Sequence, residues 1–368
     1  MRRSSAPAVL VLLAMRAIVC VDASGDGVPL SVLTTAGSPG HAMSALCIWD
    51  QMRRLTTDVR RHLFLVVPTQ YAELACSRVS AGFAPTPCKV HRAPDLRLSR
   101  AEHSPRRDYA CEARSWLRPV DGVNILAIDA DEMPAAVTRA YRLDATLHAQ
   151  PGADTARMEL STPYNFARNS LDELLLPFGV RRVAYLDTDA QPGPRFIEWY
   201  NTPRPRAKII ARSFLRSANE GDGPCEWTEG WNFSSPLVRG TLGPDDAAAD
   251  LRRFRASAFV VLDVRGYCRL RIADKITEIM QLNYDARTIV QEKQRAIGGH
   301  VTRQVGGLYS RAHHQPPFVL ALANHTVLDS PTLLPEHAGS AHCTVLQSDP
   351  RTVRARSREM PSWRTCRV

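Results

Sequence analysis

Short β-prone runs alternate with stretches of helical spacing along most of this 368-residue chain. The first such unit is residues 28–35, closed by a turn rich in Gly, Ser and Pro and followed by helical spacing over residues 43–55. Alternation of this kind predicts a parallel sheet with helices on its faces, so the expected fold class is α/β. The other predicted strands are 63–67, 89–91, 123–128, 181–187, 208–211 and 259–264, and the other predicted helices are 71–79, 135–147, 163–175 and 272–282.

Several stretches lack this periodicity. Residues 93–119 are rich in arginine, serine and proline and are predicted to be a long loop or an insertion, and residues 217–249 are irregular. Apolar periodicity also fades after residue 328. The predicted organisation is one folded domain over residues 28–330, followed by a divergent C-terminal tail over residues 331–368.

The composition is that of a globular protein. Apolar residues make up 44% and charged residues 23%, and no apolar stretch reaches 18 residues, which argues against a disordered chain and a multi-span membrane protein. The formal charge is +10, but almost all of the 47 basic residues are arginines scattered singly or in pairs. A phosphate-tracking protein concentrates them on one stripe, so no nucleic-acid partner is expected.

The N-terminus has the pattern of a targeting signal. Arg2 and Arg3 precede an apolar run over residues 6–15, and small residues around Ala23 suit cleavage. Residues 1–23 are therefore predicted to be a secretory signal peptide or an uncleaved anchor, and only the anchor would attach the chain to a membrane. The expected location is the secretory pathway: the lumen of the ER or Golgi, or outside the cell.

The cysteines fit the same compartment. Of the nine cysteines, eight remain when Cys20 is removed with the signal, and an even number in a secretory chain predicts disulfides whose pairing stays open. No cysteine or histidine spacing suggests a zinc site. Two N-glycosylation sequons, at Asn232 and Asn324, agree with this location.

Two pairs of carboxylates follow predicted strands. Asp187 and Asp189 stand one residue apart after one strand, and Asp129 and Asp131 do so after another. Two such carboxylates can converge on Mg²⁺ or Mn²⁺, whose remaining positions can take diphosphate oxygens. Ligands of open α/β sheets bind at this end of the strands. Either pair could instead be a solvated acidic turn.

Three blocks resemble one family. Asn165-Phe-Ala-Arg168, Leu171-Asp-Glu-Leu-Leu and Val183-Ala-Tyr-Leu-Asp-Thr-Asp189 form a block that resembles glycosyltransferase family 8, the retaining transferases of the glycogenin and galacturonosyltransferase type. Residues 259–283 and 307–320 resemble two later blocks in the family's order. The resemblance implies a GT-A fold, a Rossmann-like mixed sheet flanked by helices, which is the nucleotide-diphospho-sugar transferase fold.

The resemblance also implies a metal site. Asp187 and Asp189 would bind Mn²⁺ or Mg²⁺, which holds the diphosphate of the donor and neutralises charge on the leaving phosphate. The family completes the metal shell with a histidine near its C-terminus. His342 is the candidate for that ligand here.

The remaining implied site residues contact the donor. Thr34 and Thr35, at the end of the first strand, would contact the nucleotide. Arg168 would reach the donor sugar or diphosphate, and Gln315 would lie near the reacting carbon as the catalytic residue.

The implied activity is transfer of a hexose from a nucleotide-sugar, expected to be UDP-linked, to a glycan or protein acceptor with retention of configuration. Ala256 and Ala258 replace the family's asparagine and glycine, His314 replaces an acidic residue, and the family's final tryptophan motif has no counterpart. The alternative is therefore a catalytically inactive nucleotide-sugar or glycan-binding relative on the same fold. A secreted hydrolase is not favoured, because neither a Gly-x-Ser-x-Gly elbow nor a His-Glu-x-x-His motif is present.

Overall fold

The structure is a computed structural model. It describes residues 29–55, 59–99, 111, 115–148, 162–188, 192, 196–203, 205, 208–213, 231–243, 259–296, 307–309 and 315–329. The predicted signal peptide or anchor and the predicted tail lie outside these residues. Within them, no helix is long and apolar enough to cross a membrane.

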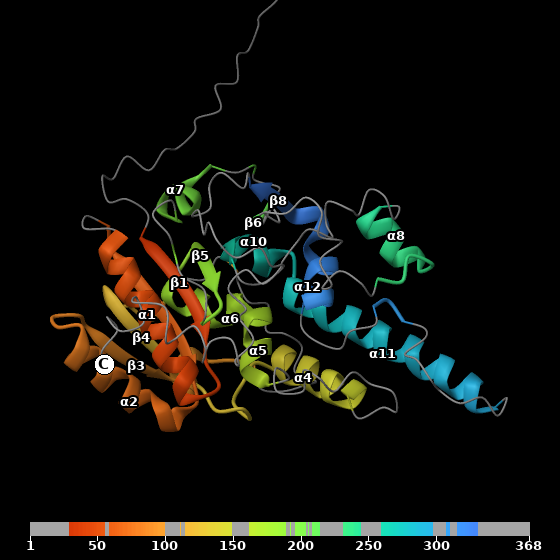
Figure 1. Ribbon diagram of the computed structural model, residues 1–368, viewed down its shortest axis with the longest axis horizontal. Coiled ribbons are helices and arrows are strands. Elements are labelled where there is room, and N and C mark those ends of the chain that lie inside the picture. The colour runs from red at the N-terminus through yellow and green to blue at the C-terminus, as the bar shows by residue number, and fades with distance from the viewer. Residues whose placement is uncertain are drawn as a thin grey trace, which may run out of the picture.

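The described strands form one mixed sheet in the order β3-β4-β2-β1-β5-β7-β6-β8 (Figure 1). Neighbouring strands are parallel, except that β7 runs antiparallel to both β5 and β6. The expected fold class, a mixed α/β sheet flanked by helices of the GT-A type, is thereby confirmed. The strands are β1 (Leu30–Thr35), β2 (Arg61–Val67), β3 (Cys88–Arg92), β4 (Gly122–Ala127), β5 (Arg182–Leu186), β6 (Ile210–Ser213), β7 (Phe259–Asp263) and β8 (Thr326–Asp329).

Helices cover both faces of the sheet, because alternate strand residues point to opposite sides. Along β1, Val32 belongs to one buried cluster and Leu33 to the other. The Val32 side is covered by α1 (Pro39–Leu55), α2 (Thr69–Gly82) and α7 (Phe196–Asn201). The Leu33 side is covered by α4 (Ala135–His148), α5 (Pro163–Ala167), α6 (Leu171–Leu175), α10 (Val264–Arg269), α11 (Ile272–Ala296) and α12 (Gln315–Leu322).

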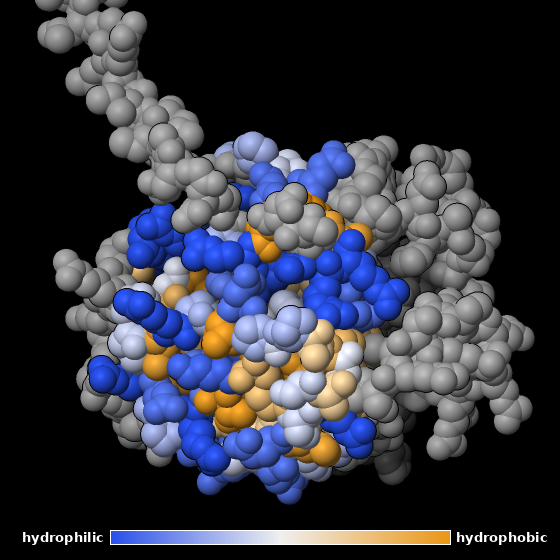
Figure 2. All heavy atoms as spheres, turned by 90° about the vertical axis from the view of Figure 1, so that its left-hand side faces the viewer, coloured by the Kyte–Doolittle hydropathy of each residue, from blue (hydrophilic) through white to orange (hydrophobic). Residues whose placement is uncertain are grey.

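The helices on the Val32 side bury their apolar residues against the sheet. Figure 2 faces the side of the molecule on which α1 and α2 lie in Figure 1, and there hydrophilic side chains surround scattered apolar ones. In α1 the buried positions include Ala45, Trp49 and Met52, which recur at helical spacing. The polar positions of the same helix, such as Arg54, remain outside.

The predicted helix over residues 163–175 is broken in two. Thr162 caps α5 by accepting a hydrogen bond from the Asn165 amide, as its position before Pro163 predicts. A 3₁₀ turn over Arg168–Ser170 then separates α5 from α6. The backbone leaves helical geometry at Ser170, whose φ and ψ are −127° and 42°, and Arg168 Nε donates to the Asn165 carbonyl across this turn.

Other differences from the sequence prediction fall in short or polar segments. The two stretches without periodicity, residues 93–119 and 217–249, contain α3 (Ala93–Leu96) and α8 (Pro236–Leu242), which are too short to show a period. Strand β6 begins two residues later than predicted, and α11 runs well beyond residue 282. Helices α7, α10 and α12 and strand β8 were not predicted.

Two disulfides join described segments, which confirms the prediction that this chain forms them. Cys76 on α2 bonds Cys88 on β3, and Cys111 bonds Cys268 on α10. The second pair packs against the large core on the Leu33 side of the sheet. It therefore ties Cys111 to α10 in the helical layer.

Candidate functional site

The order of the strands marks one place where a ligand would bind. From β1 the chain proceeds to β2 on one side, whereas β5 flanks β1 on the other side. The connections at the carboxyl ends of β1 and β5 therefore diverge, and ligands of open α/β sheets bind in the crevice that such a divergence leaves. The candidate site lies at this point.

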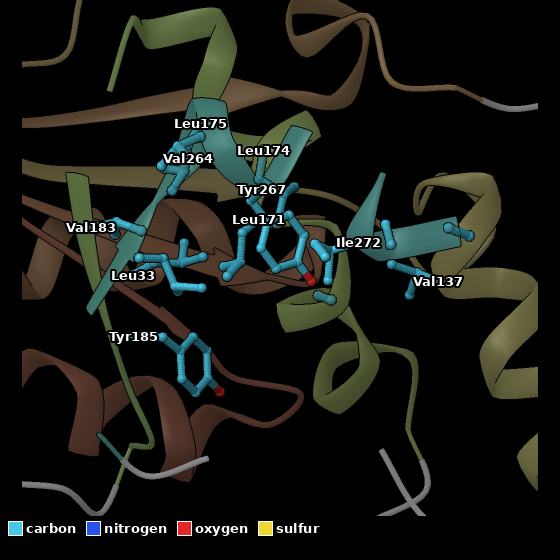
Figure 3. Packing of buried hydrophobic residues seen from close by; sticks show 14 of the residues in the cluster. Leu33, Val137, Leu171, Leu174, Leu175, Val183, Tyr185, Val264, Tyr267 and Ile272 are labelled. Carbon is cyan, nitrogen blue, oxygen red and sulfur yellow. The ribbon is translucent and has the colours of Figure 1, made fainter. Parts of the chain in front are cut away.

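Three side chains from β1 and β5 meet there. Thr35 ends β1, Tyr185 lies in β5 and Asp187 follows β5 directly. The Tyr185 hydroxyl donates to Asp187 Oδ1 at 3.0 Å and lies 3.3 Å from Thr35 Oγ1. All three side chains belong to the Leu33 side of the sheet, and Figure 3 shows the Tyr185 phenol oxygen directed away from Leu33 and Val183.

Arg168 joins this group from the turn between α5 and α6. Its Nη1 lies 2.9 Å from Asp187 Oδ1, and its guanidinium carbon lies 4.5 Å from the centre of the Tyr185 ring. The Asp187 contact is an ion pair rather than an aligned hydrogen bond. Asn165 holds the other side of the guanidinium, because its carbonyl accepts from Nε at 2.9 Å and its Oδ1 from Nη2 at 3.5 Å.

The ion pair is buried, so each charge is stable in the folded protein only while the opposite charge lies beside it. The side chains of Arg168 and Asp187 are only 7% and 10% exposed. Removing one partner of a buried pair typically costs about 3–5 kcal/mol, because the other charge is left uncompensated. The stack on Tyr185 and the two contacts to Asn165 fix the plane of the guanidinium. We call Thr35, Arg168, Tyr185 and Asp187 the switch-point cluster.

Burial keeps the Tyr185 phenol protonated. Loss of hydration raises the pKa of Tyr185 well above its ordinary value, and the nearby Asp187 carboxylate adds to the increase, whereas Arg168 opposes it. The hydroxyl therefore remains a hydrogen-bond donor at every physiological pH. Asp187 Oδ1 consequently faces one hydrogen-bond donor, the Tyr185 hydroxyl, and one cation, the Arg168 guanidinium, both supplied by the protein itself.

The structure brings together some of the predicted site residues and not others. Thr35, Arg168 and Asp187 meet, whereas the Thr34 side chain points to the opposite face, is fully buried and has no hydrogen-bond partner among the described residues. Gln315 is the first residue of α12, and its side chain is outside the described part of the chain. The other predicted residues outside it are Asp189 and His342, together with Ala256, Ala258 and His314.

The described residues do not by themselves make a metal site. They contain no group of three His, Cys, Asp or Glu side chains placed to hold an ion. At the switch-point cluster they supply one carboxylate, and its Oδ1 already faces the Arg168 cation. The predicted partners of Asp187 lie outside the described residues, so the binding of Mn²⁺ or Mg²⁺ stays a prediction.

The second acidic pair has a different environment. Asp129 Oδ1 accepts the amide of Thr69 at the start of α2, and Asp131 is exposed. Among the described residues, neither carboxylate pairs with a basic side chain. The first pair is thus distinguished by its buried cation, whereas Asp129 has a local structural role.

Two residues of the site had no predicted role. Tyr185 stands two positions before Asp187, so strand alternation places both on one face, and that spacing is the signal that could have identified it. Asn165 stands three positions before Arg168 at the start of a predicted helix, within reach of its side chain.

Comparison with known proteins adds one distant likeness. No protein-family model matches the chain, and no curated protein matches it. Among solved structures, it resembles the apo structure of the bifunctional glycosyltransferase WbbM with a TM-score of 0.42 and 9% identity. The match covers 82% of this chain and 39% of that one, so the chain corresponds to about two fifths of the length of WbbM.

Proposed function

We propose that this protein is a hexosyltransferase that uses a nucleotide-sugar, most simply a UDP-linked one, and transfers the sugar to a glycan or protein acceptor with retention of configuration. The observation that carries the proposal is the switch-point cluster. Three residues singled out by the family resemblance, Thr35, Arg168 and Asp187, meet at the edge of the sheet where ligands of such sheets bind.

The residues of the cluster have distinct tasks in this proposal. Asp187 presents a fixed carboxylate at the end of β5, and Tyr185 and Arg168 orient it through its Oδ1. Arg168 supplies a planar cation suited to a diphosphate, although its guanidinium is turned toward Asp187 and Asn165. Thr35 adds a hydroxyl at the end of β1, next to the expected position of the nucleotide.

We further propose that the reaction takes place in the lumen of the secretory pathway. The two disulfides support this location, because such bonds persist in oxidising compartments. The predicted requirement for Mn²⁺ or Mg²⁺, held by Asp187 and Asp189, is part of the same proposal and is tested in the same assay.

The test is hydrolysis and transfer from a panel of nucleotide-sugars, with and without Mn²⁺, followed by determination of the anomeric configuration of the product. We expect one donor to turn over with retention. Asp187→Asn should lower turnover by about 100-fold or more, as loss of a charged group at a reacting centre commonly does. Asp131→Asn, in the other acidic pair, is the matched control and should leave turnover unchanged.

A folding defect must be separated from a catalytic one, because Asp187→Asn leaves Arg168 buried without its counter-charge. Asp187→Glu retains the charge and shifts the carboxylate by one methylene, so it should fold and still lose most of the turnover. Full activity in folded Asp187→Glu and Asp187→Asn would disprove the role of the cluster.

The second candidate function is a nucleotide-sugar or glycan-binding protein without turnover. It is favoured by the engagement of Asp187 Oδ1 with Arg168 and Tyr185, which leaves that oxygen committed to internal partners. Binding of UDP to the native protein with no turnover of any donor would support this candidate over the transferase.

A further inference from the structure

The two glycosylation sequons have different surroundings in the fold. Asn232-Phe-Ser234 lies before α8, and Asn324-His-Thr326 lies between α12 and β8. An N-linked glycan replaces one hydrogen of the asparagine Nδ2 and needs open space beyond it. The environment of each amide therefore decides which modified chain can still reach the native fold.

Both polar atoms of the Asn232 side chain make hydrogen bonds within the protein. Its Nδ2 donates to the Gly307 carbonyl at 2.7 Å, and its Oδ1 accepts the Ser234 amide at 3.1 Å. Its main chain is bound as well, because the Asn232 amide donates to the Leu308 carbonyl. The side chain is only partly exposed and lies between its own turn and residues 307–308.

The loop that Asn232 contacts has little room to move. Gly307 has a φ of +108°, and a side chain there would come within 2.7 Å of Asn283 Oδ1. The same Asn283 oxygen accepts the amides of Leu308 and Tyr309 at 2.7 and 3.2 Å. A sugar on Asn232 Nδ2 would therefore press against a segment that is held in place from its other side.

The side chain of Asn324, unlike that of Asn232, is free of such contacts among the described residues. It is exposed, and within the described part of the chain its side chain makes no hydrogen bond. Its backbone carbonyl accepts from Lys208 Nζ at 3.0 Å, which fixes the main chain without using the amide group. Thr326 Oγ1 donates to the Leu322 carbonyl, so the hydroxyl of the sequon is also satisfied in the fold.

The position of Asn324 also keeps a glycan away from the candidate site. Strand β8 is parallel to β6, and both β5 and β6 are antiparallel to β7, so β5 and β8 point the same way. Asn324 precedes β8 and thus lies at the amino edge of the sheet, whereas Asp187 follows β5 at the carboxyl edge. Strands β7 and β6 also stand between them in the sheet order.

We propose that Asn324 carries an N-linked glycan and that Asn232 remains unmodified in the folded protein. In the modification, Asn324 Nδ2 forms a bond to C1 of an oligosaccharide carried on a lipid diphosphate. The bond from C1 to the phosphate oxygen breaks, one amide proton is lost and the lipid diphosphate leaves. The proposal rests on the lumenal location proposed above, and it is independent of the transferase activity.

The test is expression of the full chain with its own N-terminus in a eukaryotic cell that secretes proteins. Peptide-N-glycosidase digestion in H₂¹⁸O, followed by peptide mass spectrometry, marks each modified asparagine as a labelled aspartate. We expect the label on Asn324 alone, with a gel shift that is lost in Asn324→Gln and retained in Asn232→Gln. A label on Asn232, or none on Asn324, would overturn the proposal.

A control variant separates failure of this site from failure of the location. Pro203→Thr creates a new sequon at Asn201, an exposed residue at the end of α7. A glycan on Asn201 without one on Asn324 would show that the chain reaches the lumen and that the assignment of Asn324 is wrong. Absence of both would disprove the lumenal location together with the glycan, and donor turnover would still be measured separately.

Discussion

Tyr185 connects the parts of the candidate site, and its hydroxyl can be removed without changing the shape of the ring. Tyr185→Phe deletes the hydrogen bond to Asp187 Oδ1 and leaves the stack with Arg168. A hydrogen bond to a charged group is worth about 1.5–3 kcal/mol, so we expect kcat/KM for the donor to fall by about tenfold or more. Steady-state kinetics with the accepted donor measures this effect.

The matched control for that variant is Tyr200→Phe. Tyr200 is equally buried, but its hydroxyl binds the Arg182 carbonyl and the Ser31 amide at the amino ends of β5 and β1. Tyr200→Phe should lower the free energy of unfolding by about 1 kcal/mol and leave kcat/KM unchanged. Equal losses of kcat/KM in the two variants would assign Tyr185 a structural role only.

His91 gives the fold a dependence on pH. Its ring is 2% exposed, packs against Phe178 and contacts Asn124 Oδ1 at 3.3 Å. Burial lowers the pKa of His91, so below about pH 6.5 the unfolded chain binds a proton that the folded chain does not. The free energy of unfolding should therefore fall as the pH decreases from about 6.5 toward the pKa of His91 in the folded chain. Above about pH 6.5 this histidine should have no effect on the free energy of unfolding.

Urea unfolding at about pH 7.5 and about pH 5.5 checks the direction of this dependence. In His91→Gln the loss of stability between the two pH values should be smaller, because one of the titrating groups is gone. His62, whose pKa is also lowered by burial, should account for part of the remainder. An unchanged pH dependence in His91→Gln would contradict the prediction.

At the scale of elements, the cap of α5 supports the site through a short relay. Thr162 Oγ1 accepts the Asn165 amide, and Asn165 in turn holds Arg168. Thr162→Ala should lower the free energy of unfolding by about 1 kcal/mol, the usual value for a lost N-cap, and should also lower donor turnover. Thr162→Ser keeps the accepting oxygen and should retain both properties; urea unfolding and the donor assay measure them. A normal turnover in Thr162→Ala would show that Arg168 needs no help from the cap.

The elements that could be predicted are those whose pattern comes from burial of apolar residues. Strand β7 is a continuous β-prone run, and the predicted position differs from the observed one by a single residue. Helix α11 was predicted to end at residue 282, where its apolar spacing stops. In the structure Asn283 and Arg287 continue its buried face, and such polar residues are invisible to a search for apolar periodicity.

The candidate site was predictable in part for the same kind of reason. Thr35 and Asp187 end neighbouring strands, so their proximity follows from the parallel sheet. Thr34 was expected beside Thr35, but alternation along β1 sends its side chain to the other face. Arg168 contacts Asp187 from the turn between α5 and α6, and a periodic pattern of apolar residues predicts neither this turn nor the hydrogen bond from Arg168 to the Asn165 carbonyl.

At the scale of the whole molecule, the sheet separates two edges with different roles. The carboxyl edge carries the switch-point cluster. The amino edge carries the Tyr200 hydroxyl, which binds β1 and β5 together, and Asn324, where we expect a glycan. A glycan at Asn324 would therefore lie at the edge of the sheet opposite the switch-point cluster.

The two disulfides should differ in their contribution to the stability of the whole chain. Cys76 and Cys88 are 12 residues apart, whereas Cys111 and Cys268 are 157 apart. Loop-closure entropy predicts about 3 kcal/mol for the short loop and about 5 kcal/mol for the long one. Urea unfolding under non-reducing conditions should thus show a larger loss in the free energy of unfolding for Cys111→Ala/Cys268→Ala than for Cys76→Ala/Cys88→Ala.

Burial of Cys268 strengthens this expectation, because its side chain is 4% exposed and packs in the main core, where truncation also leaves a cavity. The reverse order would mean that the unfolded chain is already constrained around Cys111, so that the long crosslink removes little of its freedom.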